Sequence, residues 1–187
     1  MPEGFFTPSH HKRAERMEWE HIVPAENFGR AFVEWREGHP ECVDKNGKPF
    51  RGRNCAGRVN MEYRYMEADM HNLAPAIGAV NALRSNFNFA MLPDVPITFG
   101  TCAMKIDSKN RRAEPPESAR GIIARTYKYM EAVYPKFNMG GPTEKLMAAW
   151  DKIYPPDAWE CERARRISRV QGNQNAITEA RCREVGL

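Results

Sequence analysis

Hydrophobic residues recur at helical spacing through the C-terminal third of the chain, between prolines that interrupt the pattern. The clearest repeat follows Pro115 and Pro116, runs from Glu117 to Tyr134, and ends before Pro135. Residues that recur three or four positions apart lie on one face of a helix. The pattern therefore predicts a helix over 117–134 whose inward face carries Ala119, Ile122, Ile123, Thr126, Tyr127, Met130 and Tyr134.

Two further helices are predicted beyond this one. Thr143 is a suitable N-cap for a helix that ends near Ile153, before Pro155 and Pro156. Asp157, with Glu160 three residues later, forms a capping-box pattern for a helix that ends at Gly172. On this last helix we expect the buried side to hold Trp159, the aliphatic part of Arg163, Ile167 and Val170.

The N-terminal half shows a different pattern. Polar and apolar residues alternate from Glu18 to Val23, which predicts a strand of about five residues stopped by Pro24. A long loop rich in Gly and Asn follows. Residues 63–70 fit a helix, 71–75 are expected to be extended because proline disfavours helix at the residue before it, and 76–85 fit a short helix with inward Ile77, Val80 and Leu83. The predicted order is strand, long loop, strand, helix.

Charge and length narrow the class of protein. The 187 residues carry a formal net charge of +4 and include no apolar run near the ~18 residues of a membrane span, so we expect one globular domain. Residues 44–64 hold six basic and two acidic side chains. Such a segment suits an anionic polymer, although a solvated basic loop fits equally well. The first twenty residues lack a signal-peptide pattern, so either the protein stays inside the cell or a leader has been removed.

Five cysteines are too few for a fold built on disulfides, and none lies in a CxxC pair that would suggest zinc. Cys42 and Cys55 flank a turn-rich segment, so a disulfide between them could hold the basic loop and contribute ~3 kcal/mol. Cys102, Cys161 and Cys182 would allow one more disulfide and leave one free thiol.

The candidate for chemistry is Glu20-His21, at the end of the first predicted strand. A carboxylate is a suitable Mg²⁺ ligand, and a neutral imidazole can take a proton from an attacking water. Neighbouring residues of a regular strand point to opposite faces. The two side chains can therefore share a site only if the backbone departs from regular geometry near Pro24.

Five segments in order resemble the bacterial endonuclease I family of periplasmic or secreted, non-specific nucleases with a ββα-metal site. They are EWEHIVPA, DMHNLAPAIGAVNALRSN, PPESARGIIARTYKYME, AAWDKIYPP and WECERARRISRVQGN, and the resemblance runs from about Arg13 to Asn173. It implies an α+β, mainly helical single domain over 1–187. The ββα-metal (His-Me finger) motif would lie at about 18–86 and the helical scaffold at about 115–173. Many family members carry an upstream cysteine-containing strand and a leader, which this sequence does not show.

The resemblance also implies roles for individual residues. Glu20 corresponds to the metal-binding carboxylate and His21 to the general base, while Asn81 corresponds to a metal-binding amide, with Asn72 as the alternative. Arg53 corresponds to the phosphate-binding arginine, with Arg51 as its competitor. Two further residues are candidates for supporting roles: Arg84 for phosphate binding and His71 for a hydrogen bond behind the site.

The implied activity is hydrolysis of DNA, and of RNA as well, without sequence preference. It would use one divalent cation, Mg²⁺ with Mn²⁺ or Ca²⁺ as alternatives, and leave 5′-phosphate and 3′-hydroxyl ends. We expect a periplasmic or secreted monomer with no membrane partner. One alternative is a nucleic-acid-binding module without catalysis, which uses the arginine-rich loop 44–64. A zinc hydrolase is the other, but the five histidines show no HxxxH or HxH spacing.

Overall fold

The computed structural model describes residues 11–187, and about half of the chain is helical, so the fold is α+β. The N-terminal half contains α1 (His11–Ala14), β1 (Met17–His21), α2 (Ala25–Gly29), α3 (Val33–Arg36), α4 (Arg53–Val59), α5 (Met61–Ala68), the 3-10 turn η2 (Met70–Asn72), β2 (Leu73–Ile77), α6 (Gly78–Arg84) and β3 (Asn88–Phe89). The C-terminal half contains β4 (Lys105–Asp107), β5 (Arg112–Glu114), α7 (Glu117–Val133), α8 (Gly141–Ile153), α9 (Ala158–Gln171) and α10 (Ala176–Glu184).

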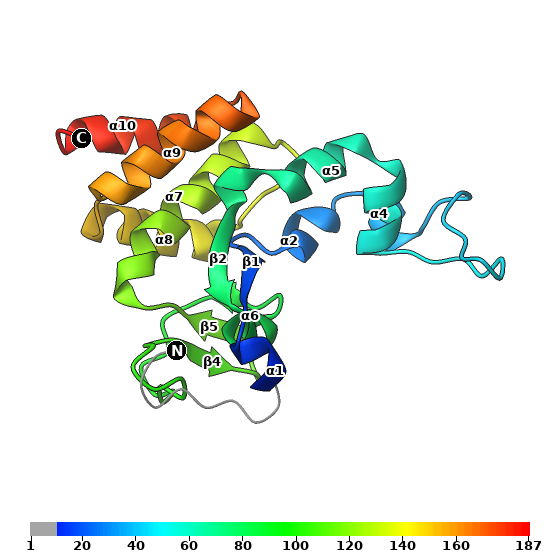
Figure 1. Cartoon of the computed structure of the whole chain (residues 1–187), viewed down its shortest axis with the longest axis horizontal. Coiled ribbons are helices and arrows are strands. Elements are labelled where there is room, and N and C mark those ends of the chain that lie inside the picture. Colours follow the sequence, from blue (N-terminus) through cyan, green and yellow to red (C-terminus); the bar gives the residue numbers. More distant parts are fainter. Residues whose placement is uncertain (1–10) are drawn as a thin grey trace.

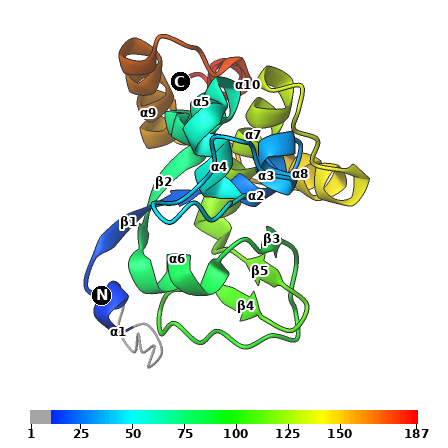
Figure 2. The same cartoon turned by 90° about the vertical axis from the view of Figure 1, so that its right-hand side faces the viewer.

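A two-stranded antiparallel ribbon runs through the middle of the molecule. β1 pairs with β2 from Met17 opposite Ile77 to His21 opposite Leu73, and α6 follows β2 directly. Helices α7 to α10 lie on one side of this ribbon and α2, α4 and α5 on the other (Figure 1). In the perpendicular view, α6 and the small second sheet lie together at one end of the molecule (Figure 2). The ribbon therefore connects the helical part with this end.

Gly78 allows α6 to begin beside the ribbon. A Cβ atom at this position would lie 2.5 Å from the backbone oxygen of Arg13 and 2.8 Å from Oε1 of Glu18. Both distances are shorter than real contacts of a Cβ atom, so a larger residue would push α6 away from β1. The glycine thus sets how closely the helix approaches the strand that carries Glu20 and His21.

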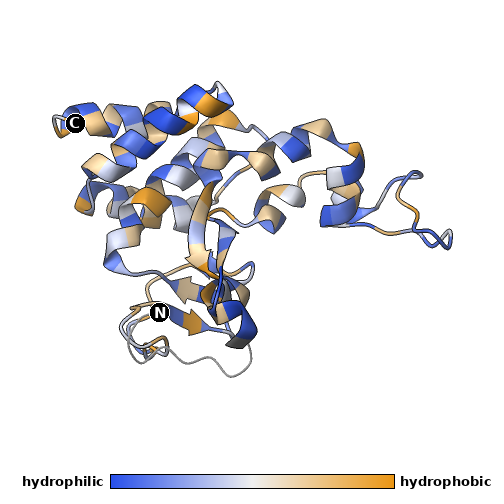
Figure 3. Cartoon of the chain, in the orientation of Figure 1, coloured by the Kyte–Doolittle hydropathy of each residue, from blue (hydrophilic) through white to orange (hydrophobic). Residues whose placement is uncertain are grey.

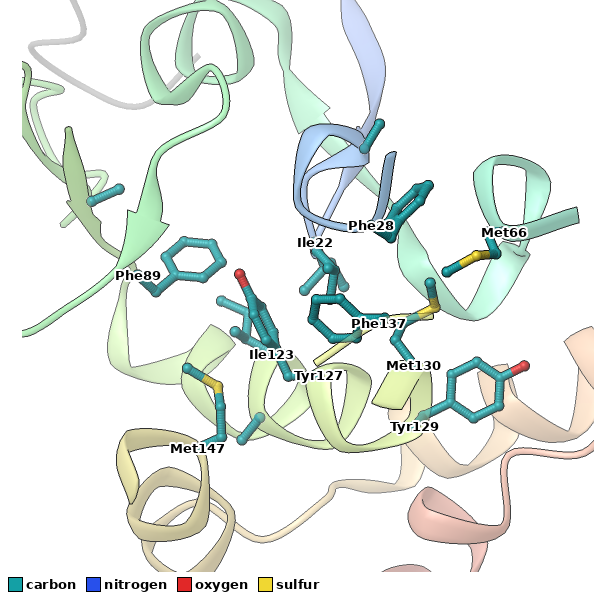
Figure 4. Packing of buried hydrophobic residues seen from close by; sticks show 14 of the residues in the cluster. Ile22, Phe28, Met66, Phe89, Ile123, Tyr127, Tyr129, Met130, Phe137 and Met147 are labelled. Carbon is teal, nitrogen blue, oxygen red and sulfur yellow. The ribbon is translucent and has the colours of Figure 1, made fainter. Parts of the chain in front are cut away.

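The hydrophobic core is built around α7. Ile123, Tyr127 and Met130 point from this helix toward Ile22 and Phe137 (Figure 4), and all five are buried. The spacing of 123, 127 and 130 is the predicted helical repeat. Because the core forms directly behind the ribbon, burial of these side chains also fixes the position of β1.

The three C-terminal helices confirm the predictions closely. α7 begins at Glu117 as predicted, and Asp157 caps α9, since its carboxylate accepts a hydrogen bond from the backbone N–H of Glu160 at 2.7 Å. α8 begins at Gly141, two residues before the predicted cap at Thr143. α9 ends at Gln171, directly before Gly172, which caps it with a left-handed φ of 83°.

One prediction about α9 was wrong. Trp159 and Val170 are exposed, with relative accessibilities of 61% and 75%, whereas Ile167 is buried as expected. The buried side of α9 instead follows Cys161, Ala164 and Ile167. Trp159 and Val170 lie off this line and face solvent.

The strand predictions were right about order and approximate about ends. The first strand covers Met17–His21 rather than 18–23. The predicted extended stretch 71–75 begins instead with the turn η2 and continues as β2 to Ile77. The patterns did not predict the second sheet, in which β5 lies between β3 and β4, nor helix α10.

The structure contains the two disulfides that the five cysteines were expected to allow. Cys42 pairs with Cys55, as proposed from their spacing, and Cys161 pairs with Cys182, which leaves Cys102 as the free thiol. The first disulfide closes the segment between α3 and α4, which projects from the body of the molecule (Figure 1). Among residues 11–187, every helix is too short or too polar to span a lipid bilayer.

Candidate active site

A polar cavity of about 610 Å³ lies where β1, α4 and α6 meet. Its lining includes five residues singled out from the sequence, which come from three separate segments of the chain: Glu20, His21, Arg53, Asn81 and Arg84. The other three candidates, Arg51, His71 and Asn72, do not belong to this lining. The fold therefore gathers one carboxylate, one imidazole, one amide and two guanidinium groups around a single space.

Glu20 and His21 both line the cavity although they are neighbours in β1. His21 is the last residue of the strand, and its partner Leu73 is the first residue of β2. Both residues keep the regular register of the ladder, with Glu20 opposite Ala74 and His21 opposite Leu73. The cavity reaches both side chains at this end of the ribbon without a break in the pairing.

The imidazole of His21 is held by a backbone group. Its Nε2 lies 2.8 Å from the carbonyl oxygen of Glu67, at the end of α5. A carbonyl oxygen can only accept, so Nε2 carries the proton and the neutral ring keeps its lone pair on Nδ1. Burial lowers the pKa of His21; the hydrogen bond to the Glu67 carbonyl opposes this, and the positive charges of Arg53 and Arg84 act with burial. The net effect favours the neutral ring, whose lone pair on Nδ1 could accept a proton.

Glu20 is paired with a buried arginine. Its Oε1 accepts a hydrogen bond from Nη1 of Arg84. Burial raises the pKa of Glu20, and the attraction of Arg84 opposes that rise. The ion pair thus holds this carboxylate in place at the edge of the cavity.

Arg84 is engaged with the protein on several sides. Its side chain is 2% exposed, and its N–H groups donate to the backbone oxygens of His21 and Ile22, both at 2.7 Å, and of Phe87 at 3.0 Å. Its guanidinium carbon also lies 4.5 Å from the centre of the Phe89 ring. These contacts tie the end of β1 to the end of α6, and they leave little of the group available to a phosphate.

The two candidate asparagines differ in their surroundings. Asn81 Nδ2 donates to Oε2 of Glu18 at 3.0 Å, which leaves its amide oxygen as the group that a cation could bind. Asn72 is fully buried, and its amide accepts from the backbone N–H of Val23 at 2.7 Å and donates to the Val23 carbonyl at 3.1 Å. The oxygen and the nitrogen of the Asn72 amide are therefore both hydrogen bonded to the backbone of Val23, which follows β1.

The two candidate arginines of the loop also differ. Arg53, the first residue of α4, lines the cavity, is 55% exposed, and forms an ion pair with the carboxylate of Glu67. Arg51 donates to the backbone oxygen of Arg36 at 3.2 Å and lies outside the cavity lining. Arg53 is thus the one of the two that faces the cavity.

His71 lies behind β2 in a buried environment. Its ring centre is 4.9 Å from that of Tyr129, and its Nε2 is 3.4 Å from the backbone oxygen of Asn173. Burial lowers its pKa. These contacts connect η2 with the C-terminal helices rather than with the cavity.

Two acidic residues at the site were missed in the sequence. Glu18 orients Asn81, and its pKa falls to about 2, chiefly because Arg13 hydrogen bonds to it. Glu67 holds His21 through its backbone and Arg53 through its carboxylate. Glu18 and Glu20 alternate along the strand, and this spacing could have indicated that Glu18 lies on the same face as Glu20. Nothing in the sequence marks Glu67, which is 46 residues from His21.

The donor set fits a hard cation better than zinc. Among residues 11–187 there is no group of three or more His, Cys, Asp or Glu side chains that could hold a metal ion. One carboxylate and one amide oxygen, completed by waters and phosphate, are a suitable set for Mg²⁺. Glu20 and Asn81 line the same cavity and offer these two ligand types.

These features define a class of protein. It is an α+β protein whose candidate site combines an imidazole and a carboxylate with arginine and amide groups, a set suited to reactions at a phosphate group. The chain matches the family model described as Endonuclease I over residues 6–180. On this match, and on the relatives described next, the chain belongs to the endonuclease I family.

The relatives are similar over most of the chain. An extracellular deoxyribonuclease of Aeromonas hydrophila is 44% identical over 91% of this chain and 69% of its own length. A periplasmic deoxyribonuclease of the same species is 42% identical over 96% of this chain and 70% of its own. An endonuclease-1 of Buchnera aphidicola subsp. Acyrthosiphon pisum is 39% identical over 96% of this chain and 66% of its own.

Proposed function

We propose that this protein is a DNA endonuclease that hydrolyses phosphodiester bonds without sequence preference, and that it also cleaves RNA. The observation that carries the proposal is the gathering of Glu20, His21, Asn81 and Arg53 around one cavity in a chain that belongs to the endonuclease I family. The names of the relatives as deoxyribonucleases support DNA as the substrate.

In this proposal His21 is the general base. The bond from Nε2 to the Glu67 carbonyl orients the ring, so Nδ1 takes a proton from the attacking water. A positioned base typically contributes ~10²–10⁴ in rate. The lowered pKa keeps the ring unprotonated at neutral pH, which is the state that the reaction needs.

Glu20 and Asn81 would hold one divalent cation, Mg²⁺ with Mn²⁺ or Ca²⁺ as alternatives. When bound, such an ion neutralises charge on the phosphate and stabilises the departing 3′ oxygen. Arg84 positions Glu20 through their ion pair, and Glu18 positions Asn81 through its carboxylate. The strand β1, strand β2 and helix α6 would together form the ββα-metal motif, with residues 1–187 acting as a single domain.

Arg53 would contact the scissile phosphate, since it is half exposed at the cavity and planar guanidinium groups suit phosphate oxygens. Cleavage between the 3′ oxygen and phosphorus would leave 5′-phosphate and 3′-hydroxyl ends. Contacts to phosphate carry no base information, so sequence preference would be absent. The names of the relatives as extracellular and periplasmic support a periplasmic or secreted location.

The test is nicking of supercoiled plasmid by the purified protein. We expect nicking in Mg²⁺, no nicking in EDTA, and a strong loss in Glu20→Gln, which keeps the shape of the side chain but weakens the metal ligand. Glu144→Gln is a matched control, because Glu144 is exposed on α8 and lies outside the cavity lining. Binding without any nicking would instead favour the alternative, a non-catalytic module that uses loop 44–64.

A further inference from the structure

Beside the candidate active site lies a larger and mainly apolar groove of about 830 Å³. It is formed by the outer side of the β1–β2 ribbon and by α9, and its lining includes Trp19, Leu73, Pro75, Trp159, Arg163 and Arg166. Trp19 and Leu73 line the polar cavity as well. The groove therefore borders the cavity that is lined by Glu20 and His21, with Trp19 and Leu73 between the two.

Two tryptophans are exposed along this groove. Trp19 is 68% and Trp159 is 61% exposed, although tryptophan contributes most to stability when it is buried. They come from different elements, β1 and α9, so neither is explained by the packing of one helix or strand. Both side chains therefore present aromatic surface on which a bound ligand could stack.

Positive charge borders the same groove. α9 carries four arginines against two glutamates, and Figure 3 shows hydrophilic positions along the middle of this helix. Glu162 forms ion pairs with Arg165, Arg166 and Arg169, so one carboxylate is shared among three guanidinium groups. The rim of the groove therefore keeps a positive excess.

Arg163 adds a charge without a carboxylate partner among the described residues. It donates to the backbone oxygens of Met70, at 2.9 Å, and Leu73, and its guanidinium carbon lies 6.0 Å from the Trp159 ring centre. It thereby fixes α9 against the start of β2 and places a cation beside the exposed aromatic ring.

We infer that this groove binds unpaired nucleotides next to the scissile bond, with bases stacked on Trp19 and Trp159 and phosphates near Arg166. The inference rests on the proposed nuclease function and adds the substrate class. In a duplex the faces of the bases are stacked inside, and only base edges, sugar and phosphate reach the surface. Exposed aromatic rings with arginines around them suit single strands, because every base presents a face for stacking.

The experiment measures binding in EDTA, where no cleavage occurs, of a labelled oligo-dT of about a dozen nucleotides and of a duplex of equal length. Trp159→Ala should weaken binding of the single strand by about 5- to 100-fold and change duplex binding much less. Trp159→Phe should retain most of the affinity, because phenylalanine also stacks. Arg166→Ala should weaken single-strand binding more than Arg183→Ala, a matched change of an exposed arginine on α10.

Three results would overturn the inference: no change in Trp159→Ala, an equal loss for both substrates, or a shift of this variant from dimer to monomer in gel filtration. The last would make the groove an interface between two copies. Trp159 is exposed, so the variant is expected to fold, and its melting temperature checks this. If wild-type protein nicks plasmid while these binding results fail, the nuclease proposal stands and only the stacking groove is rejected.

Discussion

Asn81 and Asn72 have the same side chain, but the protein uses them differently. The amide nitrogen of Asn81 donates to Glu18, so its amide oxygen is the atom that a cation could bind, whereas the Asn72 amide is paired at both ends with Val23. The resemblance favoured Asn81 as the metal ligand and kept Asn72 as the alternative. The difference depends on a contact between residues 63 positions apart, which no local pattern records.

Replacement of each asparagine by alanine should therefore affect a different property: the metal requirement for Asn81 and the stability for Asn72. Asn81→Ala should raise the Mg²⁺ concentration needed for half-maximal nicking and leave the free energy of unfolding nearly unchanged. Asn72→Ala should lower the free energy of unfolding by about 1–3 kcal/mol, because two buried backbone groups lose their partner. Metal titration and urea unfolding of both variants measure this, and the reverse order would mean that Asn72 is the ligand.

Residues next to each other in the sequence were the predictable part of the site. Glu20 and His21 form a contiguous carboxylate and imidazole, so a metal ligand beside a general base could be proposed from the sequence alone, and the structure places both residues at one cavity. Glu67 is different, because it holds His21 with a backbone oxygen that every residue type possesses. Arg84 was singled out as a phosphate contact, and that role stays a prediction beside the backbone contacts that the structure describes.

At the scale of elements, a buried ion-pair cluster joins the C-terminal helices. Arg125 on α7 donates to the carboxylate of Glu160 on α9 at 2.7 and 2.6 Å and to Asp151 on α8 at 3.0 Å. Asp151 also pairs with Lys128 at 2.5 Å and with Arg181 of α10 at 3.3 Å. One carboxylate thus contacts cations from two other helices.

Asp151→Asn should destabilise the protein, because it removes the negative charge that Arg125, Lys128 and Arg181 share and leaves the buried Arg125 with Glu160 as its remaining carboxylate partner. Loss of one member of a buried pair typically costs about 3–5 kcal/mol, and we expect about 3 kcal/mol at pH 7 by urea unfolding. Asp94→Asn is a matched control, because Asp94 is exposed and should change stability by less than about 0.5 kcal/mol. Equal stability of the two variants would show that the cluster does not stabilise the fold.

The same cluster predicts how stability changes with pH. Burial alone would raise the pKa of Asp151, but hydrogen bonds from Lys128 and Arg125 outweigh it and the pKa is lowered. A carboxyl with a lowered pKa in the folded state stabilises fully above its unfolded pKa of about 3.9 and loses this contribution below it. The difference between wild type and Asp151→Asn should therefore shrink as pH falls below about 4.

Helices were more predictable than strands for a physical reason. α7 repeats its buried positions over 17 residues, which gives the periodicity several turns to appear. β3, β4 and β5 have only two or three residues each, too few for alternation to stand out. The face of α9 was mispredicted at Trp159 because a large apolar residue was assumed to be buried.

For the whole molecule, the distribution of charge predicts how nucleic acid binds. The segment 44–64 carries most of the basic excess, and its loop projects beside α4, where Arg53 begins the helix (Figure 1). The sequence predicted the charge of this segment but not where the loop projects. The path of a long loop is fixed by tertiary contacts and by the Cys42–Cys55 disulfide.

Binding to duplex DNA in EDTA should weaken steeply with salt, because each phosphate contact releases counterions. Arg53→Gln should weaken binding at low salt and reduce the slope of log affinity against log salt by about 1. Arg183→Gln, on α10, should leave the slope unchanged. An unchanged slope in Arg53→Gln would remove this residue from the phosphate contacts.

Whether the imidazole of His21 is the base is decided by the cleavage rate of His21→Ala in Mg²⁺, measured together with DNA binding of the same preparation. We expect a loss of ~10²–10⁴ in rate, with affinity for DNA retained, because the imidazole takes a proton and does not hold the substrate. Full cleavage by His21→Ala would contradict the proposed mechanism, since the cavity would then hydrolyse DNA without its base.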